Sequence, residues 1–507
     1  MPEYLSPGVY IEEIEIGAKP IEGVSTSTAG CLGKTERGPT DPRLVTSFPQ
    51  FQRLYGGFLK DSNLAYAVDG FFANGGQRCF IGRIVGKGAK ASSEKFKDEN
   101  DKNAIEVTAI GPGKWGDGIK IKIENASLSD LEESLPINPE LFKLTVSYYK
   151  DKVNQTEPSQ IEIYDNLSPS TVSSESIEKR INDISLLIKV ERLTDDTEKR
   201  ITNAEQWLKG GTEGDTITAT EFKGVTDPPP VPGERTGLFA FEEVDEISIV
   251  FAPDENAVKG VTGALIEHCE KLKDRFAVLS AAQNAGLISK LRPPQDSKYA
   301  AFYYPWIEIL DPVLNIGKLV PPSGHIAGIY ARSDIERGVH KAPANEVVRG
   351  VTKLQFQLLK GDQDILNPRG VNVLRSFLGR GIRVWGARTV STDSLWKYVN
   401  VRRLFIFIEE SIEEGTQWVV FEPNDERLWA RVRQTITQFL TRVWRDGALM
   451  GTTPEEAFFV KCDRSTMTQD DIDNGRLIVL IGVAPVKPAE FVIFRIAQWT
   501  GGSEVTE

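Results

Sequence analysis

Residues 244–281 read VDEISIVFAPDENAVKGVTGALIEHCEKLKDRFAVLSA, and this stretch decides the fold class. The segment VDEISIVFAP is predicted to be a buried strand, the segment that follows it has the pattern of a helix, and AVLSA is predicted to be a second strand. A strand, a helix and a strand in this order form the crossover unit of a parallel sheet. We therefore expect an α/β unit here.

An earlier part of the chain supplies the other half of this unit. Residues 25–85 contain the runs STSTAGCLG and RCFIGRIVG around a predicted helix that Gly75 and Gly76 close. Residues 88–236 are instead rich in Lys, Glu, Ser, Asn and Asp, contain short alternating strands and end in DPPPVPG. The sequence predicts a discontinuous α/β domain, residues 23–87 and 237–345, interrupted by an inserted β-rich domain, residues 88–236.

The last third of the chain is predicted to form a separate β-rich domain, residues 346–499. Strands are expected at GIRVWGARTV, QWVVFE, RLIVLIGVAP and EFVIFRI, with two amphipathic helices between them. Residues 500–507 are a short tail. The predicted fold class is therefore a combination of α/β and α+β in a multidomain chain.

Both ends of the chain carry apolar strands that lack an obvious sheet. Residues 1–22 are predicted to be an isolated arm strand, whose apolar residues are Val9, Tyr10, Ile11, Ile14 and Ile16. In EFVIFRI the apolar residues occupy both parities: Phe491, Val492, Ile493, Phe494 and Ile496. A strand that is apolar on both faces needs cover on both faces. The open question is whose sheet this last strand joins.

Composition limits the classes of function. The chain has 507 residues and a formal net charge of −12, which makes broad nucleic-acid binding improbable. It has no run of about 18 apolar residues and no Sec-type leader at its start, so we expect synthesis in the cytoplasm and no direct membrane insertion. The four cysteines lie far apart, which argues against a zinc site or a disulfide framework. We expect them to be small core residues, and we expect no metal or cofactor.

Two stretches imitate motifs of enzymes. In PPSGHIAG, Ser323 lies two residues before His325, but no G-x-S-x-G elbow is present. In TAGCLGKT, the phosphate-loop pattern would need a glycine at position 28, where the chain has Thr28. We therefore expect no catalytic residues and no enzyme. A serine hydrolase with an α/β core is kept as the alternative function, and a nucleotide-driven motor as a weaker one.

The segment NDERLWARVRQTITQFLTRVWRDG is predicted to be a long helix that Asn424 caps and Gly447 closes. At 100° per residue its apolar residues form one stripe, and four arginines form another on the far side: Arg427, Arg431, Arg442 and Arg445. We call these four the arginine stripe. It carries no acidic residue between its ends, so the sequence predicts either a solvated face or a contact with an acidic partner.

These segments resemble the contractile tail sheath proteins of phages and of phage-tail-like injection systems. The resemblance is carried by PEYLSPGVYIEE, FFANGGQRCFIGRI, LFAFEEVDEISIVFAP, VPPSGHIAGIYARSDIERGVHKAPAN, ILNPRGVNVLRSFLGRGIRVWGARTV, YVNVRRLFIFIEESIEEGTQWVVFEPN and VAPVKPAEFVIFRI. It spans both ends and most of the chain. Within residues 88–236 only GKWGD resembles the family.

The resemblance implies a structural subunit that stacks in hexameric rings around an inner tube protein and contracts to drive that tube through a target cell envelope. It also implies a subtilisin-like α/β middle domain without a working protease site, and partners in the baseplate and in a tail terminator or cap. The particle would be a virion tail or a phage-tail-like particle, released or retained in the cell.

In sheaths of this type the N-terminal and C-terminal arms complete β-sheets of neighbouring subunits, which would answer the question of the last strand. The inserted domain would lie on the outside, and the C-terminal domain would face the tube through the arginine stripe. Exposed ion pairs are worth roughly 0 to 1 kcal/mol each, which suits a contact that must break during contraction.

Overall fold

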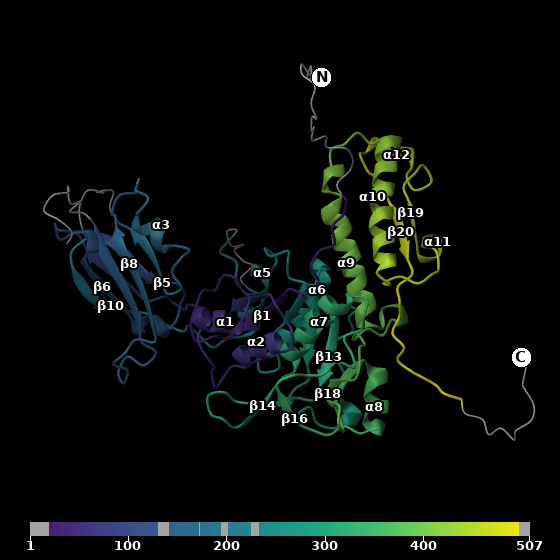
Figure 1. The fold of residues 1–507 in the computed structure, drawn as a ribbon, viewed down its shortest axis with the longest axis horizontal. Coiled ribbons are helices and arrows are strands. Elements are labelled where there is room, and N and C mark those ends of the chain that lie inside the picture. Colours follow the sequence, from purple (N-terminus) through teal and green to yellow (C-terminus); the bar gives the residue numbers. More distant parts are fainter. Residues whose placement is uncertain (1–19, 130–140, 172, 194–200, 225–232, 496–507) are drawn as a thin grey trace, which may run out of the picture.

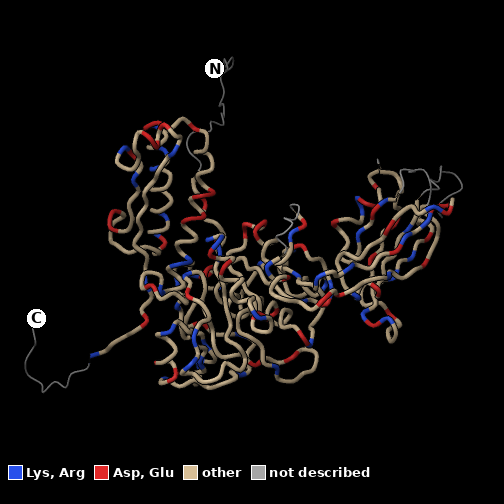
Figure 2. The backbone as a smooth tube through the Cα atoms, turned by 180° about the vertical axis from the view of Figure 1, so that it is seen from behind, with Lys and Arg blue, Asp and Glu red and all other residues tan. Residues whose placement is uncertain are grey.

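The computed structural model describes residues 20–129, 141–171, 173–193, 201–224 and 233–495. Figure 1 shows three bodies: an inserted β unit at one end, a central α/β unit, and an upright unit built around two long helices at the other end. Both signs of charge are spread over all three bodies (Figure 2). The chain is therefore a mixed α/β multidomain protein.

Eight strands form the main sheet of the central unit, in the order β18-β17-β13-β12-β11-β1-β3-β2. Neighbours from β17 to β3 are parallel, and the edge strands β18 and β2 are antiparallel. The strands are β1 (Ala29–Gly33), β2 (Arg43–Val45), β3 (Cys79–Arg83), β11 (Ile249–Phe251), β12 (Phe276–Ser280), β13 (Ala300–Tyr304), β17 (Val371–Phe377) and β18 (Gly381–Val384). The predicted crossover unit is confirmed, because β11 and β12 are parallel neighbours joined by α6 (Val261–Leu272).

Helices cover both faces of this sheet. Gly30 and Gly33 lie three residues apart on β1 and so face opposite sides. A Cβ at Gly30 would meet Phe241 of α5 (Gly237–Phe241), and one at Gly33 would meet Leu64 of α2 (Leu64–Ala73). Helix α6 lies beside α5, because Arg275, directly after α6, donates to the carbonyl of Phe241 at 2.8 Å.

Helix α7 (Ser323–Arg337) packs against α2 with the two backbones in contact. A Cβ at Gly324 would lie 2.2 Å from the carbonyl oxygen of Ala67, and one at Gly328 would lie 2.3 Å from that of Phe71. The helix is buried from Ser323 to Ser333. Its glycines are therefore needed for close packing. The four cysteines are free and buried, as predicted.

The central unit also contains a three-stranded sheet and several short helices. The sheet has the order β15-β14-β16, with β14 (Ile307–Leu310), β15 (Gly317–Val320) and β16 (Val351–Leu354). The helices are α1 (Phe48–Tyr55), α4 (Ala219–Lys223) and α8 (Lys360–Leu366). Ser47 caps α1 by accepting a hydrogen bond from the backbone N–H of Gln50.

The inserted unit has a hydrophobic core of its own, made of residues between Phe96 and Leu208. One of its sheets has the order β4-β5-β9 and the other β10-β6-β7-β8. The strands are β4 (Ser93–Lys97), β5 (Asn103–Ala109), β6 (Ile119–Asn125), β7 (Phe142–Tyr148), β8 (Gln160–Leu167), β9 (Ile188–Arg192) and β10 (Ala204–Trp207), and the helix α3 (Ile177–Ile181) packs on β8 and β9. Contact with the central unit includes Arg37, which donates to Gln160 at 2.9 Å.

The predicted boundary before residue 346 is not where the main sheet ends. Strands β17 and β18 follow that boundary, yet β17 pairs with β13 and belongs to the eight-stranded sheet. The sequence suggested a new domain because a loop at residues 341–345 interrupts the apolar pattern, but the chain returns to the same sheet after it. The upright unit begins instead near α9 (Val399–Gly415).

The upright unit contains α9, α10 (Glu426–Arg445), α11 (Pro454–Ala457), β19 (Phe458–Lys461), α12 (Gln469–Asp473) and β20 (Leu480–Val483). Strands β19 and β20 form a two-stranded antiparallel sheet. Asp425, not Asn424, caps α10 by accepting from the N–H of Leu428 at 2.9 Å, while Asn424 accepts from the indole of Trp429. The strand predicted at QWVVFE is wrong, because Gln417–Val419 form a 3-10 helix.

The end of the predicted N-terminal arm belongs to the upright unit. Ile21 is only 1% exposed and packs in the core of that unit, beside Gly415 at the end of α9. The N–H of Val24 donates to the hydroxyl of Ser411 at 3.1 Å. Residues 20–26 therefore run along α9, so residues 20–22 of the predicted arm, residues 1–22, belong to the upright unit. Residues 1–19, with Val9, Tyr10, Ile11, Ile14 and Ile16, lie outside the described residues.

A buried ion pair joins the upright unit to the central unit. Arg403 of α9 donates to both carboxylate oxygens of Asp334 on α7, at 3.0 and 2.7 Å, and to the carbonyl of Thr26 at 2.7 Å. The two side chains are 4% and 3% exposed. Positive charge near the start of a helix opposes the helix dipole, and Asp334 offsets it here. We call Arg403, Asp334 and Thr26 the junction.

A buried carboxylic acid lies directly after β11. Glu255 accepts a hydrogen bond from the N–H of Ser280 at 2.6 Å, and burial raises its pKa from 4.5 to about 8. The folded chain thus holds a proton that the unfolded chain releases above about pH 5. Because the folded pKa is the higher one, the contribution to stability is full below pH 4.5 and is lost as the pH rises through 8.

We expect the Glu255→Gln variant to unfold at a higher temperature than the wild type at pH 9. The gain should be roughly 4 kcal/mol or less at pH 9 and should shrink toward pH 5, since the amide has no charge to bury. The measurement is the thermal unfolding midpoint between pH 5 and 9. Glu270→Gln, at an exposed position on α6, is the control. An equal pH dependence in wild type and Glu255→Gln would contradict this assignment.

Candidate assembly surfaces

An apolar groove of about 820 Å³ lies between the two long helices and β20. Leu428, Val432 and Ile436 of α10 form one wall. The end of α9 and the 3-10 helix form another, and Leu477, Val479 and Ile481 form the wall along β20. Within the described residues β20 pairs only with β19, so its other edge is free at this groove. We call this the β20 groove.

The two-stranded sheet is apolar on both faces. Phe458, Ile481 and Val483 pack toward the helices, in the core of the upright unit. Phe459, Ile478 and Leu480 are exposed large apolar residues of the same strands and the segment before them. A strand added at the free edge of β20 would therefore meet apolar side chains on both of its faces.

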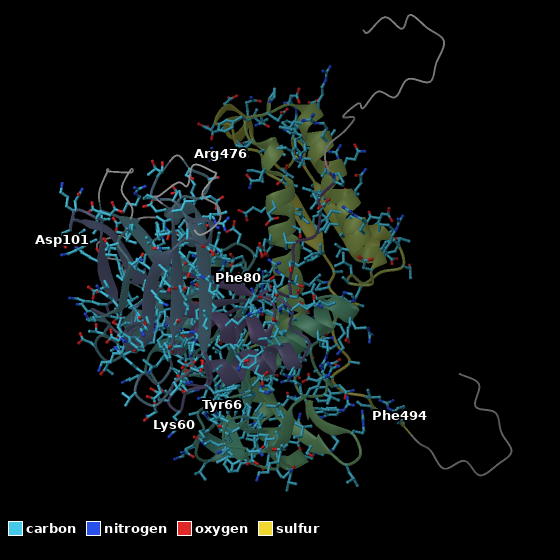
Figure 3. All side chains as sticks on the ribbon, turned by 60° about the vertical axis from the view of Figure 1, so that its left-hand side comes forward. Lys60, Tyr66, Phe80, Asp101, Arg476 and Phe494 are labelled. Atoms are coloured by element: carbon cyan, nitrogen blue, oxygen red, sulfur yellow. The ribbon has the colours of Figure 1, made fainter. Side chains whose placement is uncertain are left out.

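The C-terminal segment leaves the molecule with its apolar residues uncovered. Phe491, Val492, Ile493 and Phe494 are 69–83% exposed and belong to no strand of the described chain. Figure 3 shows Phe494 standing clear of the body, on the chain that runs away from it. Ile496 lies outside the described residues. The predicted strand has no sheet of its own, which leaves both of its faces available.

Glu490 fixes the root of this segment. Its Oε1 accepts from Arg388 Nε at 2.7 Å and from Asn367 Nδ2 at 2.8 Å. Its Oε2 accepts from Arg388 Nη2 at 2.8 Å and from the hydroxyl of Tyr398 at 2.9 Å. Burial alone would raise the pKa of Glu490, but these hydrogen bonds outweigh it and lower the pKa to about 2. The side chain is ionised at neutral pH and stays paired.

The arginine stripe divides into two pairs. All four side chains are exposed on α10. Arg431 bonds Glu422 at 3.2 Å and lies over the ring of Trp418, and Arg442 donates to the carbonyl of Ile21. Within the described residues, Arg427 and Arg445 have no ion pair or hydrogen bond from their side chains. Only these two are thus free for an acidic partner, while Arg442 holds the N-terminal segment.

The residues that imitate enzyme motifs do not form a site. Ser323 is the first residue of α7 and His325 packs on Gly70 of α2, and both are buried. Neither Ser323 Oγ nor His325 Nδ1 has a hydrogen-bond partner among the described residues. Burial lowers the pKa of His325 to about 4. Lys34 of the phosphate-loop imitation pairs with Asp61 at 2.6 Å.

The described residues provide neither a metal site nor a helix that could span a membrane. No cluster of three or more His, Cys, Asp or Glu side chains that could hold a metal ion occurs there. In the same part of the chain, every helix is too short or too polar to cross a membrane.

Sequence reasoning missed the β20 groove and the role of Glu490. The groove is formed by residues from three segments, and no pattern in any one of them reveals it. Glu490 carried a weak signal, because it is the acidic residue directly before the doubly apolar FVIFRI. The predicted arm residues from Phe491 to Phe494 lie together, whereas the arginine stripe is beside the groove wall on α10, and its Arg431 pairs with Glu422 at the groove.

Comparison with known proteins identifies the class. Residues 235–390 match the phage tail sheath protein central domain, and residues 391–498 match the phage tail sheath C-terminal domain. The two matches meet at residue 390, just after β18, which agrees with the end of the main sheet. The chain belongs to the phage tail sheath family, whose members are structural proteins. It is a subunit of a contractile tail sheath, of the kind found in phages and phage-tail-like injection systems.

Individual relatives agree with this assignment. A putative prophage major tail sheath protein of Pseudomonas aeruginosa is 26% identical over 282 residues, which cover 53% of this chain and 71% of the relative. The helical sheath of the anti-feeding prophage in its contracted state is similar in structure, with a TM-score of 0.59 and 25% identity over 98% of this chain and 99% of that chain. A chain of the anti-feeding prophage baseplate, 6-fold symmetrised, has a TM-score of 0.58 and 25% identity over 98% of this chain and 99% of that chain.

The division of the arginine stripe gives a prediction about the N-terminal segment. Arg442→Ala should loosen residues 20–26, because it removes the donor to the carbonyl of Ile21. We expect cleavage after the exposed Glu22 by a glutamyl endopeptidase to become about three- to tenfold faster, as for the loss of a charged hydrogen bond of about 1 kcal/mol. Arg427→Ala, on the same stripe, is the control. Equal cleavage rates in the two variants would show that Arg442 does not hold the segment.

Proposed function

We propose that this sheath subunit assembles by strand exchange, forms stacked hexameric rings around an inner tube, and contracts to drive that tube through a target envelope. The observation that carries the proposal is the combination of an uncovered, doubly apolar C-terminal segment and a two-stranded sheet that pairs with no third strand of the described residues. The 6-fold symmetrised assembly of the similar baseplate chain supports six subunits per ring.

The occupant of the β20 groove is the C-terminal arm, residues 491–496, of a second copy of this chain. An extended strand there would form backbone hydrogen bonds with the free edge of β20 and would bury apolar side chains on both faces. The N-terminal arm would take the other edge of the sheet, on β19. Each backbone bond contributes about 0.5–1.5 kcal/mol net, so the two strands and their apolar faces would hold a subunit by something on the order of 10 kcal/mol.

Removing the apolar arm should abolish assembly. We expect a chain that ends at Glu490 to fold as a soluble monomer and to form no long sheaths, because the β20 groove of its neighbour stays empty. A chain that ends at Gln498 keeps the apolar stretch and should assemble. Sheath length, measured by negative-stain electron microscopy, decides between the two. Normal sheaths from the chain that ends at Glu490 would refute strand exchange through this arm.

We assign the contact with the inner tube to Arg427 and Arg445. They are the exposed arginines of the stripe that lack partners in the described chain, and they suit a contact with an acidic tube surface. Such pairs are weak one by one and are screened by salt, so they can be released ring by ring. Arg431 and Arg442 act within the subunit instead.

Charge reversal tests this assignment. The double variant Arg427→Glu and Arg445→Glu should keep the unfolding temperature of the wild type but assemble poorly on the tube or contract without a trigger. The control, Arg53→Glu and Arg292→Glu, makes the same charge change on the central unit, where both side chains are exposed. The fraction of extended tails at low salt is the measurement. Equal fractions for the two double variants would show that another surface holds the tube.

Two further parts of the proposal concern the other units. The inserted unit lies on the outside of the sheath; its separate core and its place at one end of the molecule support this (Figure 1). Its predicted end at residue 236 is too late, because Phe222 of α4 packs in the core of the central unit. The central unit is a subtilisin-like core without a protease site, supported by the largely parallel sheet, the buried helix α7 and the inaccessible Ser323. The remaining partners are the baseplate and a tail terminator or cap.

A further inference from the structure

The hydrogen bonds of Glu490 suggest a role beyond local stability. Both carboxylate oxygens accept two bonds each, from Arg388, Asn367 and Tyr398. Ala489 before it and Phe491 after it are exposed. The C-terminal arm is thus attached to the body at one residue, and the direction in which it leaves depends on that residue. Lys397 Nζ also lies 3.2 Å from Oε2, and we call Glu490 with these four partners the Glu490 clamp.

We propose that the Glu490 clamp prevents the C-terminal arm from folding into the β20 groove of its own chain and so reserves the arm for a neighbouring subunit. This inference rests on the strand exchange proposed above. Without such a device, an arm that fits the groove would close on its own chain, because a tethered partner is present at a high effective concentration.

The clamp and the groove lie toward opposite ends of α9. Tyr398 of the clamp precedes the first residue of α9, whereas Ile412 and Thr416 at the other end of that helix line the groove. Ile412 lies 14 residues after Tyr398, so about 21 Å separate the clamp from the first groove residue on α9. In Figure 1 the chain after β20 descends beside the long helices and only then leaves the molecule, at the end away from the N-terminus.

The length of the arm does not bridge that separation. The six residues 491–496 span at most about 20 Å when extended, and all six must lie along β20 to fill the groove. While Glu490 is held, the apolar stretch cannot lie along β20 with all six residues and so cannot fill its own groove. If Glu490 is released, the chain after β20 is free from about residue 487 and can turn back. The clamp therefore decides between closure on the same chain and exchange with a neighbour.

Cross-linking distinguishes the two outcomes. Cysteines introduced as Phe494→Cys in the arm and Val420→Cys, an exposed residue at the groove, are joined with a short bismaleimide in the full-length chain under assembly conditions. The native cysteines are buried, and the chain without the new cysteines gives the background. Mixing isotopically light and heavy chains before assembly separates links within one chain from links between chains by mass spectrometry.

We expect links between chains in the otherwise native protein. Glu490→Ala should raise the ratio of links within a chain to links between chains by at least about tenfold, as for the loss of charged hydrogen bonds. Arg388→Gln should also raise this ratio, because it removes the guanidinium that donates to both oxygens of Glu490. Lys487→Ala, an exposed residue in the same segment, should leave the ratio unchanged.

Links that stay between chains in both Glu490→Ala and Arg388→Gln, with folding unchanged by circular dichroism, would overturn the clamp and leave strand exchange intact. The absence of any link between chains in the native background would overturn strand exchange itself, and the clamp with it. The two failures are therefore distinguishable in one experiment.

Discussion

The arrangement of this subunit depends on the junction of Arg403 with Asp334 and Thr26. Arg403 lies on α9, Asp334 on the buried helix of the main sheet, and Thr26 in the segment that enters the first strand. Because all three groups lose water on burial, the pair is stable only while each is satisfied, and removing one partner of such a pair costs about 3–5 kcal/mol. The junction thus ties the upright unit to the central one through a buried contact that is costly to break.

The two ends of α9 hold the segments that lead to the N-terminal and C-terminal arms, so the position of this helix determines where each arm starts. Residues 20–26 run along the helix toward its far end, so the N-terminal segment leaves beside Gly415. The C-terminal segment is held near Tyr398, at the opposite end. The helix therefore keeps the two attachment points, beside Gly415 and at Tyr398, about 25 Å apart. In such a subunit the terminal arms and the two-stranded sheet that would bind a neighbour's arm lie at separate places. This separation favours contacts between successive subunits over closure of an arm on its own chain.

Two kinds of contact in the proposed sheath follow different physical rules. Strand addition with apolar burial is strong and tolerates bending, since backbone hydrogen bonds follow the edge of the sheet. Exposed arginine contacts are weak, act over about 8–10 Å at ordinary ionic strength and can be broken singly. A contracting assembly needs both, because subunits must stay joined to one another while they release the surface that they enclose.

The sequence by itself determined the parallel α/β core, the separate inserted unit, the long amphipathic helix and the two apolar ends, because periodicity and composition are local properties. It also identified Phe491 to Phe494 as an apolar segment without an obvious sheet in its own chain. It did not determine that β17 and β18 return to the main sheet, that Arg442 holds Ile21, or that Glu490 binds Arg388. Nor did it determine the β20 groove, which three separate segments form. Such features depend on residues far apart in the chain, and only the tertiary structure brings them together.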